Sequence, residues 1–497
     1  MMITAKNRHF WGLWLLATLA LVAYLAYTLF MGEDKRLFMP NELTGGHHQI
    51  GVACEACHTT PFADGKTSKK EFQQACESCH ADVREKPFDS HPKAKFKDPR
   101  NADLLEKVDA LHCIGCHTEH KPDKTHVGGY TQPKDFCIHC HANVGEERPS
   151  HKGMDFMTCN DAGCHNYHNN QALYENFLVK HLHEPDILEK TGLPARDFAQ
   201  RLAELVDYPH DKYPVEPLTQ EVIEQPKSSV KSEKQQKTIE HDWLNTAHAN
   251  AGVSCQACHV LPLPTAKVDD AVDDTSMATE QSTKPAEAPD SQTTAVWQDK
   301  PDQQESCGQC HGLETKHFQE GKHGMRLKLG LSPMTPAMAR LPMQKGSQHK
   351  TLNCTSCHSA HRFDTEQAAV EACLGCHADE HSLAYKSSPH YTLWQQELAG
   401  TLRKGQGVSC ASCHMPRVDM DVNDWMSRIV VMHNQNATLV PREKMLRPAC
   451  LHCHGLEFSI NAISDDALVN KNFTGQPTFK TDSLRLAEEE EKRHQAK

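Results

Sequence analysis

The chain has 497 residues, a formal net charge of −12 at pH 7 and a mean hydropathy of −0.63. This negative charge argues against nucleic acid as a partner and favours protein partners with basic docking faces. Only 38% of the residues are hydrophobic and 6% are aromatic, which excludes a protein of this length whose core is built from apolar side chains alone.

The first predicted element is a membrane-spanning helix over residues 11–31. This stretch, WGLWLLATLALVAYLAYTLFM, contains no charged residue and is long enough to cross a bilayer. Lys6 and Arg8 precede it, which predicts that the N-terminus stays in the cytoplasm and that the rest of the chain lies outside. A cleaved signal peptide is the alternative, but its apolar core is usually shorter, and MGEDKRLF at 31–38 is a poor cleavage site.

Ten copies of the motif CxxCH follow, and they use twenty of the 22 cysteines. Two thiols in this spacing reach the two vinyl groups of a haem as thioethers, and the adjacent histidine then falls under the iron as its proximal ligand. Zinc is the alternative for CxxC pairs, but zinc does not need a histidine after every second cysteine. The predicted attachment residues are Cys54, Cys57 and His58; Cys76, Cys79 and His80; Cys113, Cys116 and His117; Cys137, Cys140 and His141; Cys255, Cys258 and His259; Cys307, Cys310 and His311; Cys354, Cys357 and His358; Cys373, Cys376 and His377; Cys410, Cys413 and His414; and Cys450, Cys453 and His454.

The two remaining cysteines belong to the sequence CNDAGCH at 159–165. We interpret Cys159, Cys164 and His165 as an eleventh attachment site with a widened loop, in which Gly163 eases the turn. A disulfide between Cys159 and Cys164 is the alternative, and it leaves His165 unexplained. The sequence therefore predicts eleven covalently bound c-type haems. The maturation chemistry of such haems predicts that the haem domains lie in a bacterial periplasm, with a single-pass anchor in the inner membrane.

A second axial ligand is available for every predicted haem, because eleven of the 35 histidines are proximal and 24 remain. Bis-histidine ligation is therefore the expected rule. Three motifs read CHxxH, and their second histidine cannot easily reach the far face of its own haem, so we expect it to bind a neighbouring haem. The candidate distal ligands are His48, His91, His120, His126, His151, His168, His181, His248, His323, His349, His361, His390 and His433.

The motifs fall into two groups, separated by a stretch without cysteine at about 166 to 254. The expected fold class is mainly α with extensive coil and almost no sheet, with cores packed by haem. The predicted domains are a cytoplasmic N-terminus at 1–10, a transmembrane anchor at 11–31, a five-haem module at 44–185, a helical and polar linker at 186–245, a six-haem module at 246–460 with a disordered insertion at 264–305, and a charged C-terminal tail at 461–497. The end of this tail, LRLAEEEEKRHQAK, is predicted to be a charged helix that is frayed or solvated.

Three phrases of the second module carry a family resemblance: GVSCASCHMPR (407–417), CLGCHADEHSLAYKSSPHYTLW (373–394) and MHNQN (432–436). The first is similar to the late CxxCHMP motif of the superfamily of pentahaem nitrite reductases, octahaem hydroxylamine oxidoreductases and octahaem tetrathionate reductases. The module resembles that superfamily, with one departure. The catalytic haem of the nitrite reductases uses a CxxCK motif, and this chain contains none.

The first module with its anchor resembles membrane-bound tetrahaem quinol dehydrogenases and small cytochromes of the c3 type. This resemblance implies that electrons enter near the membrane, with the quinol pool as a possible donor and redox proteins as partners.

Two functions remain open from the sequence. The first is a membrane-anchored electron carrier in a respiratory chain, and the second is a respiratory oxidoreductase of a small nitrogen or sulfur compound with its active haem in the C-terminal module. An active haem needs an open iron with polar groups above it. The candidate catalytic residues are Lys322, His323, Arg326, Tyr385, Lys386 and His390. We favour the carrier, because histidines are abundant enough to close every iron.

Overall fold

The computed structural model describes most of the chain in several stretches. Cys164, His165, most of the predicted linker and most of the predicted insertion lie outside the described residues. The described residues are 5–32, 35–60, 65–81, 91, 93–126, 128–159, 167–168, 173, 175–194, 233–261, 296–423, 426–436, 442–478 and 480–496.

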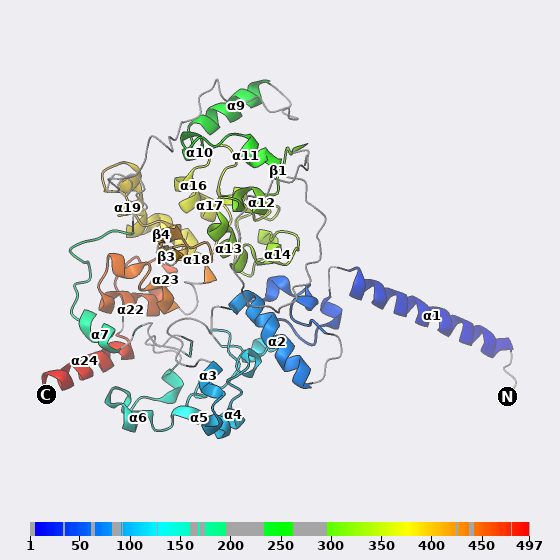
Figure 1. Cartoon of the computed structure of the whole chain (residues 1–497), viewed down its shortest axis with the longest axis horizontal. Helices are drawn as coiled ribbons and strands as arrows, with labels where there is room; N and C mark the ends of the chain where they lie inside the picture. The colour runs from blue at the N-terminus through cyan, green and yellow to red at the C-terminus, as the bar shows by residue number, and fades with distance from the viewer. Residues whose placement is uncertain are drawn as a thin grey trace, which may run out of the picture. The chain divides into compact units, whose positions relative to one another are not determined.

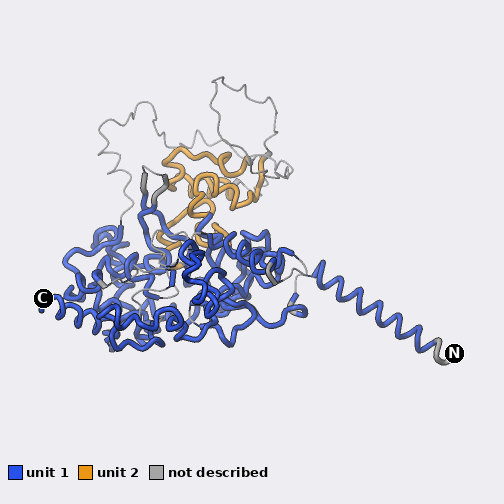
Figure 2. The backbone as a smooth tube through the Cα atoms, turned by 60° about the horizontal axis from the view of Figure 1, so that its bottom comes forward, with its two compact units in different colours: residues 1–196, 316–352, 373–497 blue, residues 197–315, 353–372 orange. Residues whose placement is uncertain are grey.

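The chain divides into two compact units, which Figure 2 distinguishes by colour. Unit 1 comprises residues 1–196, 316–352 and 373–497, and unit 2 comprises residues 197–315 and 353–372. Unit 1 therefore contains the predicted attachment motifs of the first module and the three last motifs of the chain. Unit 2 contains the motifs that begin at Cys255, Cys307 and Cys354. The number of haems in each predicted module stays a prediction.

The described chain is mainly helical with little strand, as the sequence predicts (Figure 1). Most helices are short, because each attachment motif needs only one turn. In the N-terminal part of unit 1 the elements are α1 (Ala5–Phe30), η1 (Arg36–Phe38), η2 (His48–Ile50), η3 (Cys54–Ala56), α2 (Gly65–His80), α3 (Lys93–Phe96), η5 (Pro99–Asn101), α4 (Ala102–Lys107), η6 (Cys113–Gly115), η7 (Pro122–Lys124), α5 (Ile138–His141), α6 (Val144–Glu147), η8 (Pro149–His151), η9 (Phe156–Thr158) and α7 (Glu175–His181).

The later elements follow the same pattern of short helices. Those of unit 2 are α9 (Glu233–Leu244), α10 (Ala247–Asn250), α11 (Gln256–His259), β1 (Val260–Leu261), β2 (Val296–Trp297), α12 (Gln303–Gly308), α15 (Cys354–Cys357) and α16 (Thr365–Ala369). Two helices run across a unit boundary, α13 (Gly312–Glu320) and α17 (Glu371–Leu374). The remaining elements of unit 1 are α14 (Met325–Lys328), η10 (Pro336–Met338), α18 (Glu380–Ala384), η11 (Tyr385–Ser387), α19 (Pro389–Leu398), α20 (Cys410–His414), β3 (Arg417–Asn423), β4 (Met426–Val431), η12 (Arg442–Met445), η13 (Cys450–His452), α22 (Leu456–Ser464), α23 (Asp466–Asn470) and α24 (Asp482–Gln495).

Two antiparallel hairpin pairs make up the described sheet structure. β1 pairs with β2 in unit 2, where Val260 lies opposite Trp297. β3 pairs with β4 in unit 1 from Arg417 opposite Val431, with an irregularity near Asp421. The second hairpin follows directly after α20, which contains the motif at Cys410.

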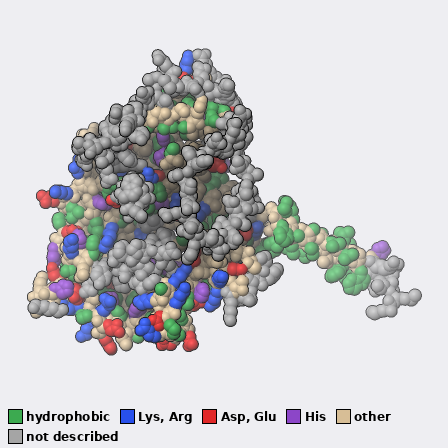
Figure 3. Space-filling view, in the orientation of Figure 1, with side chains coloured by type: hydrophobic (Ala, Val, Ile, Leu, Met, Phe, Trp, Pro, Cys, Tyr) green, Lys and Arg blue, Asp and Glu red, His purple; other side chains and the backbone are tan. Residues whose placement is uncertain are grey.

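Helix α1 is the one candidate membrane span among the described residues. Its segment His9–Phe30 is long and apolar enough to cross a bilayer, and none of it is buried. Figure 3 shows hydrophobic side chains along α1, which differs from the mixed charges on the visible face of the remaining chain. Length and composition alone fit a membrane anchor or a signal peptide equally.

A leucine-rich core lies in unit 1 where α7, α22 and α24 pack together (Figure 1). Leu456 and Leu484 are completely buried in it. The structure thus differs from the frayed or solvated helix expected for LRLAEEEEKRHQAK. Charged residues fill the C-terminal half of α24, but Leu484 and Ala487 lie one turn apart in its N-terminal half, and both are buried in this core.

Candidate haem-binding sites

Each of the ten described CxxCH motifs forms one helical turn, which at Cys76 is the last turn of α2. In eight of them the backbone N–H of the histidine donates to the carbonyl of the first cysteine, at 2.8–3.0 Å. The turn at Cys410 starts with a capping box between Ser409 and Ser412, and the turn at Cys354 starts with one between Asn353 and Ser356. One turn brings both thiols and the histidine to neighbouring positions, which is the arrangement that thioether attachment and proximal ligation require.

Nine of the ten described motif histidines face a second histidine from outside their own motif. The tenth, His358, stacks on the ring of Phe363 at 4.8 Å between centroids. The facing pairs and their ring-centroid distances are His47–His80 at 6.1 Å, His58–His120 at 6.5 Å, His91–His141 at 5.9 Å, His117–His168 at 6.3 Å, His248–His311 at 6.0 Å, His259–His361 at 6.1 Å, His323–His377 at 6.2 Å, His381–His414 at 6.0 Å and His390–His454 at 6.2 Å.

These distances fit two imidazoles on opposite sides of one iron. A metal–imidazole bond is about 2.0 Å long, and the ring centre lies roughly another ångström behind the nitrogen, so trans ligands have centroids about 6 Å apart. Direct ring stacking would bring the centroids closer. Among the described residues no group of three or more His, Cys, Asp and Glu side chains gathers as an ordinary metal-ion site. The residues present therefore fit bis-histidine haem ligation.

Hydrogen bonds at Nδ1 orient many of these imidazoles. A backbone carbonyl only accepts, so an Nδ1 atom that contacts one must carry the proton, and Nε2 is then left as the metal-binding nitrogen. The Nδ1 contacts to carbonyl oxygens are His91 to Tyr167 at 2.9 Å, His117 to Gly129 at 3.0 Å, His120 to Asn41 at 2.8 Å, His259 to Gln298 at 2.7 Å, His381 to Val469 at 2.5 Å and His454 to Asp186 at 2.9 Å.

At His47, the partner of Nδ1 is a carboxylate and not a backbone carbonyl. Its Nδ1 lies 2.6 Å from Oε1 of Glu119, which also accepts from the backbone N–H of Thr44 at 2.9 Å and from its hydroxyl at 2.8 Å. Burial by itself would raise the pKa of Glu119, but the bonds from His47 and Thr44 outweigh it and lower the pKa to about 2. The carboxylate is therefore ionised, and it strengthens the imidazole of His47 as an electron donor.

Burial keeps several facing imidazoles neutral. Burial first, and the opposite histidine second, lowers the pKa of His323, His390 and His414 to about 4. A neutral imidazole is the form that binds a metal. The electrostatic state of these three side chains is therefore the one that an axial ligand needs.

Left-handed backbone occurs beside the histidine pairs. The four described non-glycine residues with positive φ are His120 (59°), Phe363 (36°), Asn472 (49°) and Phe473 (58°). His120 is itself a member of a pair, Phe363 contacts the ring of His248 at 4.5 Å, and Asn472 bonds the carbonyl of His381 at 3.2 Å. Such backbone costs conformational energy and concentrates at functional sites.

Cysteines of successive motifs contact one another. The first cysteine of one CxxCH motif lies within interaction distance of the first cysteine of the next in three cases, Cys76 with Cys113, Cys307 with Cys354 and Cys373 with Cys410, and Cys137 lies in the same way beside Cys159. Further thiols lie close enough to interact electrostatically, Cys57 with Cys79, Cys116 with Cys137, Cys258 with Cys307 and Cys413 with Cys450. Neighbours in sequence order are therefore neighbours in space within each of these sets.

Seven of the predicted distal candidates belong to facing pairs, namely His91, His120, His168, His248, His323, His361 and His390. The three CHxxH histidines among them each face the attachment histidine of a different motif. The sequence interpretation missed His47 and His381. His381 lies one turn after His377 in a CHxxxH sequence, and this spacing could have indicated His381 as a distal ligand.

The other six distal candidates have different surroundings in the structure. His349 is exposed. The contacts of the other five are His48 Nδ1 to the carbonyl of Gly45 at 3.0 Å, His126 to the ring of Tyr130 at 4.8 Å, His151 to the hydroxyl of Ser150 at 3.0 Å, His181 to the carboxylate of Glu184 at 2.5 Å and His433 Nδ1 to the carbonyl of Val431 at 2.9 Å.

The candidate catalytic residues divide among several contacts. His323 and His390 face motif histidines, and the hydroxyl of Tyr385 donates to the carbonyl of Val408 at 2.7 Å. Lys386 is exposed, and Lys322 is half-buried, so that burial lowers its pKa. Arg326 is bonded to backbone and serine, as described below.

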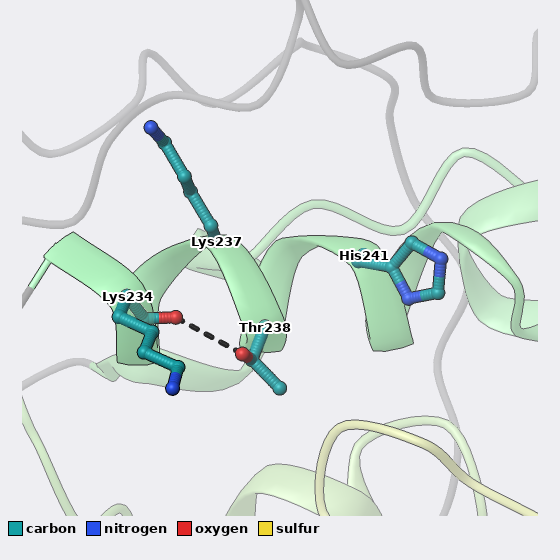
Figure 4. Close-up of a pocket in the computed structure, with 4 residues that line it drawn as sticks. All are labelled: Lys234, Lys237, Thr238 and His241. Carbon is teal, nitrogen blue, oxygen red and sulfur yellow. Dashed lines mark hydrogen bonds between the residues drawn. The ribbon is translucent and has the colours of Figure 1, made fainter.

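A surface depression in unit 2 lies along α9. Lys234, Lys237, Thr238 and His241 line it, and Figure 4 shows that the hydroxyl of Thr238 donates to the carbonyl of Lys234, at 3.0 Å. None of these four residues belongs to a facing pair.

Comparison with known proteins adds one finding to this geometry. Residues 46–142 match the family model of cytochrome c3. The match covers the motifs at Cys54, Cys76, Cys113 and Cys137, in the segment whose sequence resembles c3-type cytochromes. It supports a multihaem c-type cytochrome that transfers electrons, and it implies covalently bound c-type haems. No curated protein and no solved structure matches the chain.

Proposed function

We propose that the protein is a membrane-anchored cytochrome that carries electrons through eleven c-type haems, nearly all ligated by two histidines. The nine facing imidazole pairs carry this proposal, because each contains one motif histidine at the distance that an intervening iron requires. When bound, haem supplies reversible one-electron oxidation and reduction at its iron. The cysteines and histidines of the chain attach, orient and close the iron sites.

The contact of Cys159 supports the widened eleventh site. The first cysteine of a motif contacts the first cysteine of its neighbour in the pairs Cys76–Cys113, Cys307–Cys354 and Cys373–Cys410. Cys159 has this same relation to Cys137. It thus occupies the place of a first motif cysteine, which favours a haem at 159–165 over a disulfide.

The thiol contacts also support electron transfer among neighbouring sites. In unit 1 they connect the sites at Cys54, Cys76, Cys113, Cys137 and Cys159 in sequence order. They also connect the sites at Cys373, Cys410 and Cys450 in unit 1, and the sites at Cys255, Cys307 and Cys354 in unit 2. Electron tunnelling weakens steeply with distance, so adjacent attachment sites are what a carrier needs.

The site nearest the anchor is the proposed point of electron input. Lys35 follows α1 closely and forms an ion pair of 3.7 Å with Glu55, which lies inside the first attachment motif. We propose that the quinol pool or a membrane protein donates electrons here, in a bacterial inner membrane. Periplasmic redox proteins with basic docking faces would then accept them, because the chain has a net charge of −12.

The decisive test is the haem count and the spin state of the purified full chain. Intact mass should show eleven haems, and Cys164→Ala should lower the count to ten. Electron paramagnetic resonance should be dominated by low-spin haem. Ten haems with a disulfide between Cys159 and Cys164 would contradict the eleventh site. A stoichiometric high-spin signal that nitrite or hydroxylamine perturbs, with turnover, would replace the carrier by an oxidoreductase.

The angles between the two ring planes of each pair predict the shape of the electron paramagnetic resonance spectrum. Three pairs are nearly perpendicular, at 86°, 88° and 90°, and two are nearly parallel, at 9° and 22°. Perpendicular imidazoles leave two iron d orbitals nearly equal in energy, and parallel ones separate them. The oxidised protein should therefore show both strongly anisotropic and rhombic low-spin signals. A spectrum with only one of the two classes would contradict these ring orientations.

A further inference from the structure

Two histidine pairs from distant parts of the sequence lie in neighbouring loops of unit 1. The first is His47–His80, and the second is His323–His377. His47 directly precedes η2, and His323 lies two residues before α14. The two short helices η2 and α14 pack against each other. Each pair therefore takes one imidazole from the same loop contact.

Arg326 is the side chain that joins the two loops. It is 7% exposed, and its Nη1 donates to the carbonyl of Gln49 at 2.6 Å. Its Nε donates to the carbonyl of Ser332 at 2.8 Å, and its Nη2 donates to the hydroxyl of Ser332 at 3.0 Å. A guanidinium presents its N–H groups in a fixed fork, so these three bonds fix its position and orientation.

The loop that carries His47 is also held from its other side. Glu119 accepts from Thr44 and His47, and Arg340 pairs with Glu42 at 3.5 Å. His48 closes the loop internally through the carbonyl of Gly45. The bond from Arg326 to Gln49 is the contact that joins this loop directly to the helix that follows His323.

We propose that Arg326 is a positioning residue that fixes the imidazoles of His47 and His323 relative to each other. The inference rests on the proposed function, because it assumes that both imidazoles are axial ligands. It extends that function by naming a link between the early and the late attachment sites of unit 1. The link uses all three nitrogens of a buried guanidinium, which supports a positioning role for Arg326.

Substitution of Arg326 should change two iron sites together. Arg326→Gln removes the charge and the fork, leaves the carbonyl of Gln49 without its donor and lets both loops move. Arg326→Lys keeps the charge but cannot make all three bonds, so its effect should be smaller. Ser332→Ala removes a single acceptor and should have the smallest effect on a fold that stays intact.

Arg442→Gln is the matched control. Arg442 also donates to a buried backbone carbonyl, that of Ile463 at 3.3 Å, and it pairs with Asp466 at 2.5 Å. Ile463 belongs to the leucine-rich core, Asp466 is exposed, and neither residue belongs to a histidine pair. Each variant of the full, haem-loaded chain is measured by haem content, by low-spin signals in electron paramagnetic resonance and by redox titration.

In Arg326→Gln, we expect the low-spin signals and midpoint potentials of two sites to shift, those of His47–His80 and His323–His377, while the haem content stays constant. The shifts should be smaller in Arg326→Lys and smallest in Ser332→Ala. Arg442→Gln should leave all signals in place. If Arg326→Gln loses haem, the shifts in Arg326→Lys and Ser332→Ala decide the question. Unchanged signals in these variants, or a shift at one site only, would overturn the proposal. A wild-type protein without low-spin haem would instead refute the proposed function itself.

Discussion

The segment 46–142 and the core formed by α7, α22 and α24 are built in different ways. The core contains Leu446, Leu456 and Leu484, each completely buried. The most buried apolar side chains of segment 46–142 are still 6–9% exposed, and its histidines face one another across gaps of about 6 Å. Apolar side chains complete the leucine-rich core by themselves, whereas segment 46–142 needs a large flat group between its imidazoles.

Haem removal should separate the two regions most strongly, because only segment 46–142 depends on haem for its folding. When the full chain is produced without haem attachment, amides of 93–126 should exchange with solvent at nearly the rate of an unfolded chain, because cofactor binding is part of their folding free energy. Amides of α22 and α24 should keep more of their protection. Hydrogen exchange with mass spectrometry measures both regions in one sample. Equal protection of 93–126 with and without haem would show that its side chains suffice.

A cavity in the leucine-rich core should destabilise that core and leave the haem sites unchanged. Leu484→Ala removes a completely buried side chain and should lower the free energy of unfolding of this core by about 2–5 kcal/mol. The haem spectrum should stay unchanged. Leu341→Ala is the control, since Leu341 is 57% exposed, and it should change stability by less than about 0.5 kcal/mol. Denaturant unfolding measures both, and equal losses would contradict the assigned core.

Loss of one distal imidazole should affect one site only. His120→Gly suits the positive φ of 59° at this position and removes the ring that faces His58. The haem count should stay the same, because both thioethers and the proximal histidine remain, and one haem should become high spin. His349→Gly, at an exposed histidine, is the control. An unchanged low-spin spectrum in His120→Gly would remove His120 from the ligands.

The smallest expected change concerns a single hydrogen-bond acceptor. Glu119→Gln keeps an acceptor for His47 but removes the negative charge that stabilises the oxidised iron. The midpoint potential of one haem should therefore rise, with no change in haem count or spin state. Glu106→Gln, at an exposed glutamate, should leave all potentials as they are. Redox titration measures these potentials. A lower or unchanged midpoint potential in Glu119→Gln would contradict this role of the carboxylate.

The sequence interpretation was least complete for α24 and for the distal ligands. The run of charges at 488–493 predicted a frayed or solvated helix, yet Leu484 and Ala487 are buried in the leucine-rich core. His48 was chosen as a distal ligand, whereas the structure directs the adjacent His47 at His80. A shift of one residue changes the direction of a side chain, and spacing alone does not reveal which of two neighbouring histidines points inward.

The sequence alone indicated a multihaem c-type cytochrome, a mainly helical chain and one apolar helix that could span a membrane, and it predicted the residues that attach haem. Both thiols and the proximal histidine of a site lie within one helical turn, so their chemistry is local and visible as a motif. Tertiary structure alone decided which imidazole faces His80 or His414, and that Arg326 joins two loops from distant parts of the chain. A facing imidazole comes from any segment that the fold brings within reach, and no fixed spacing in the sequence records that contact.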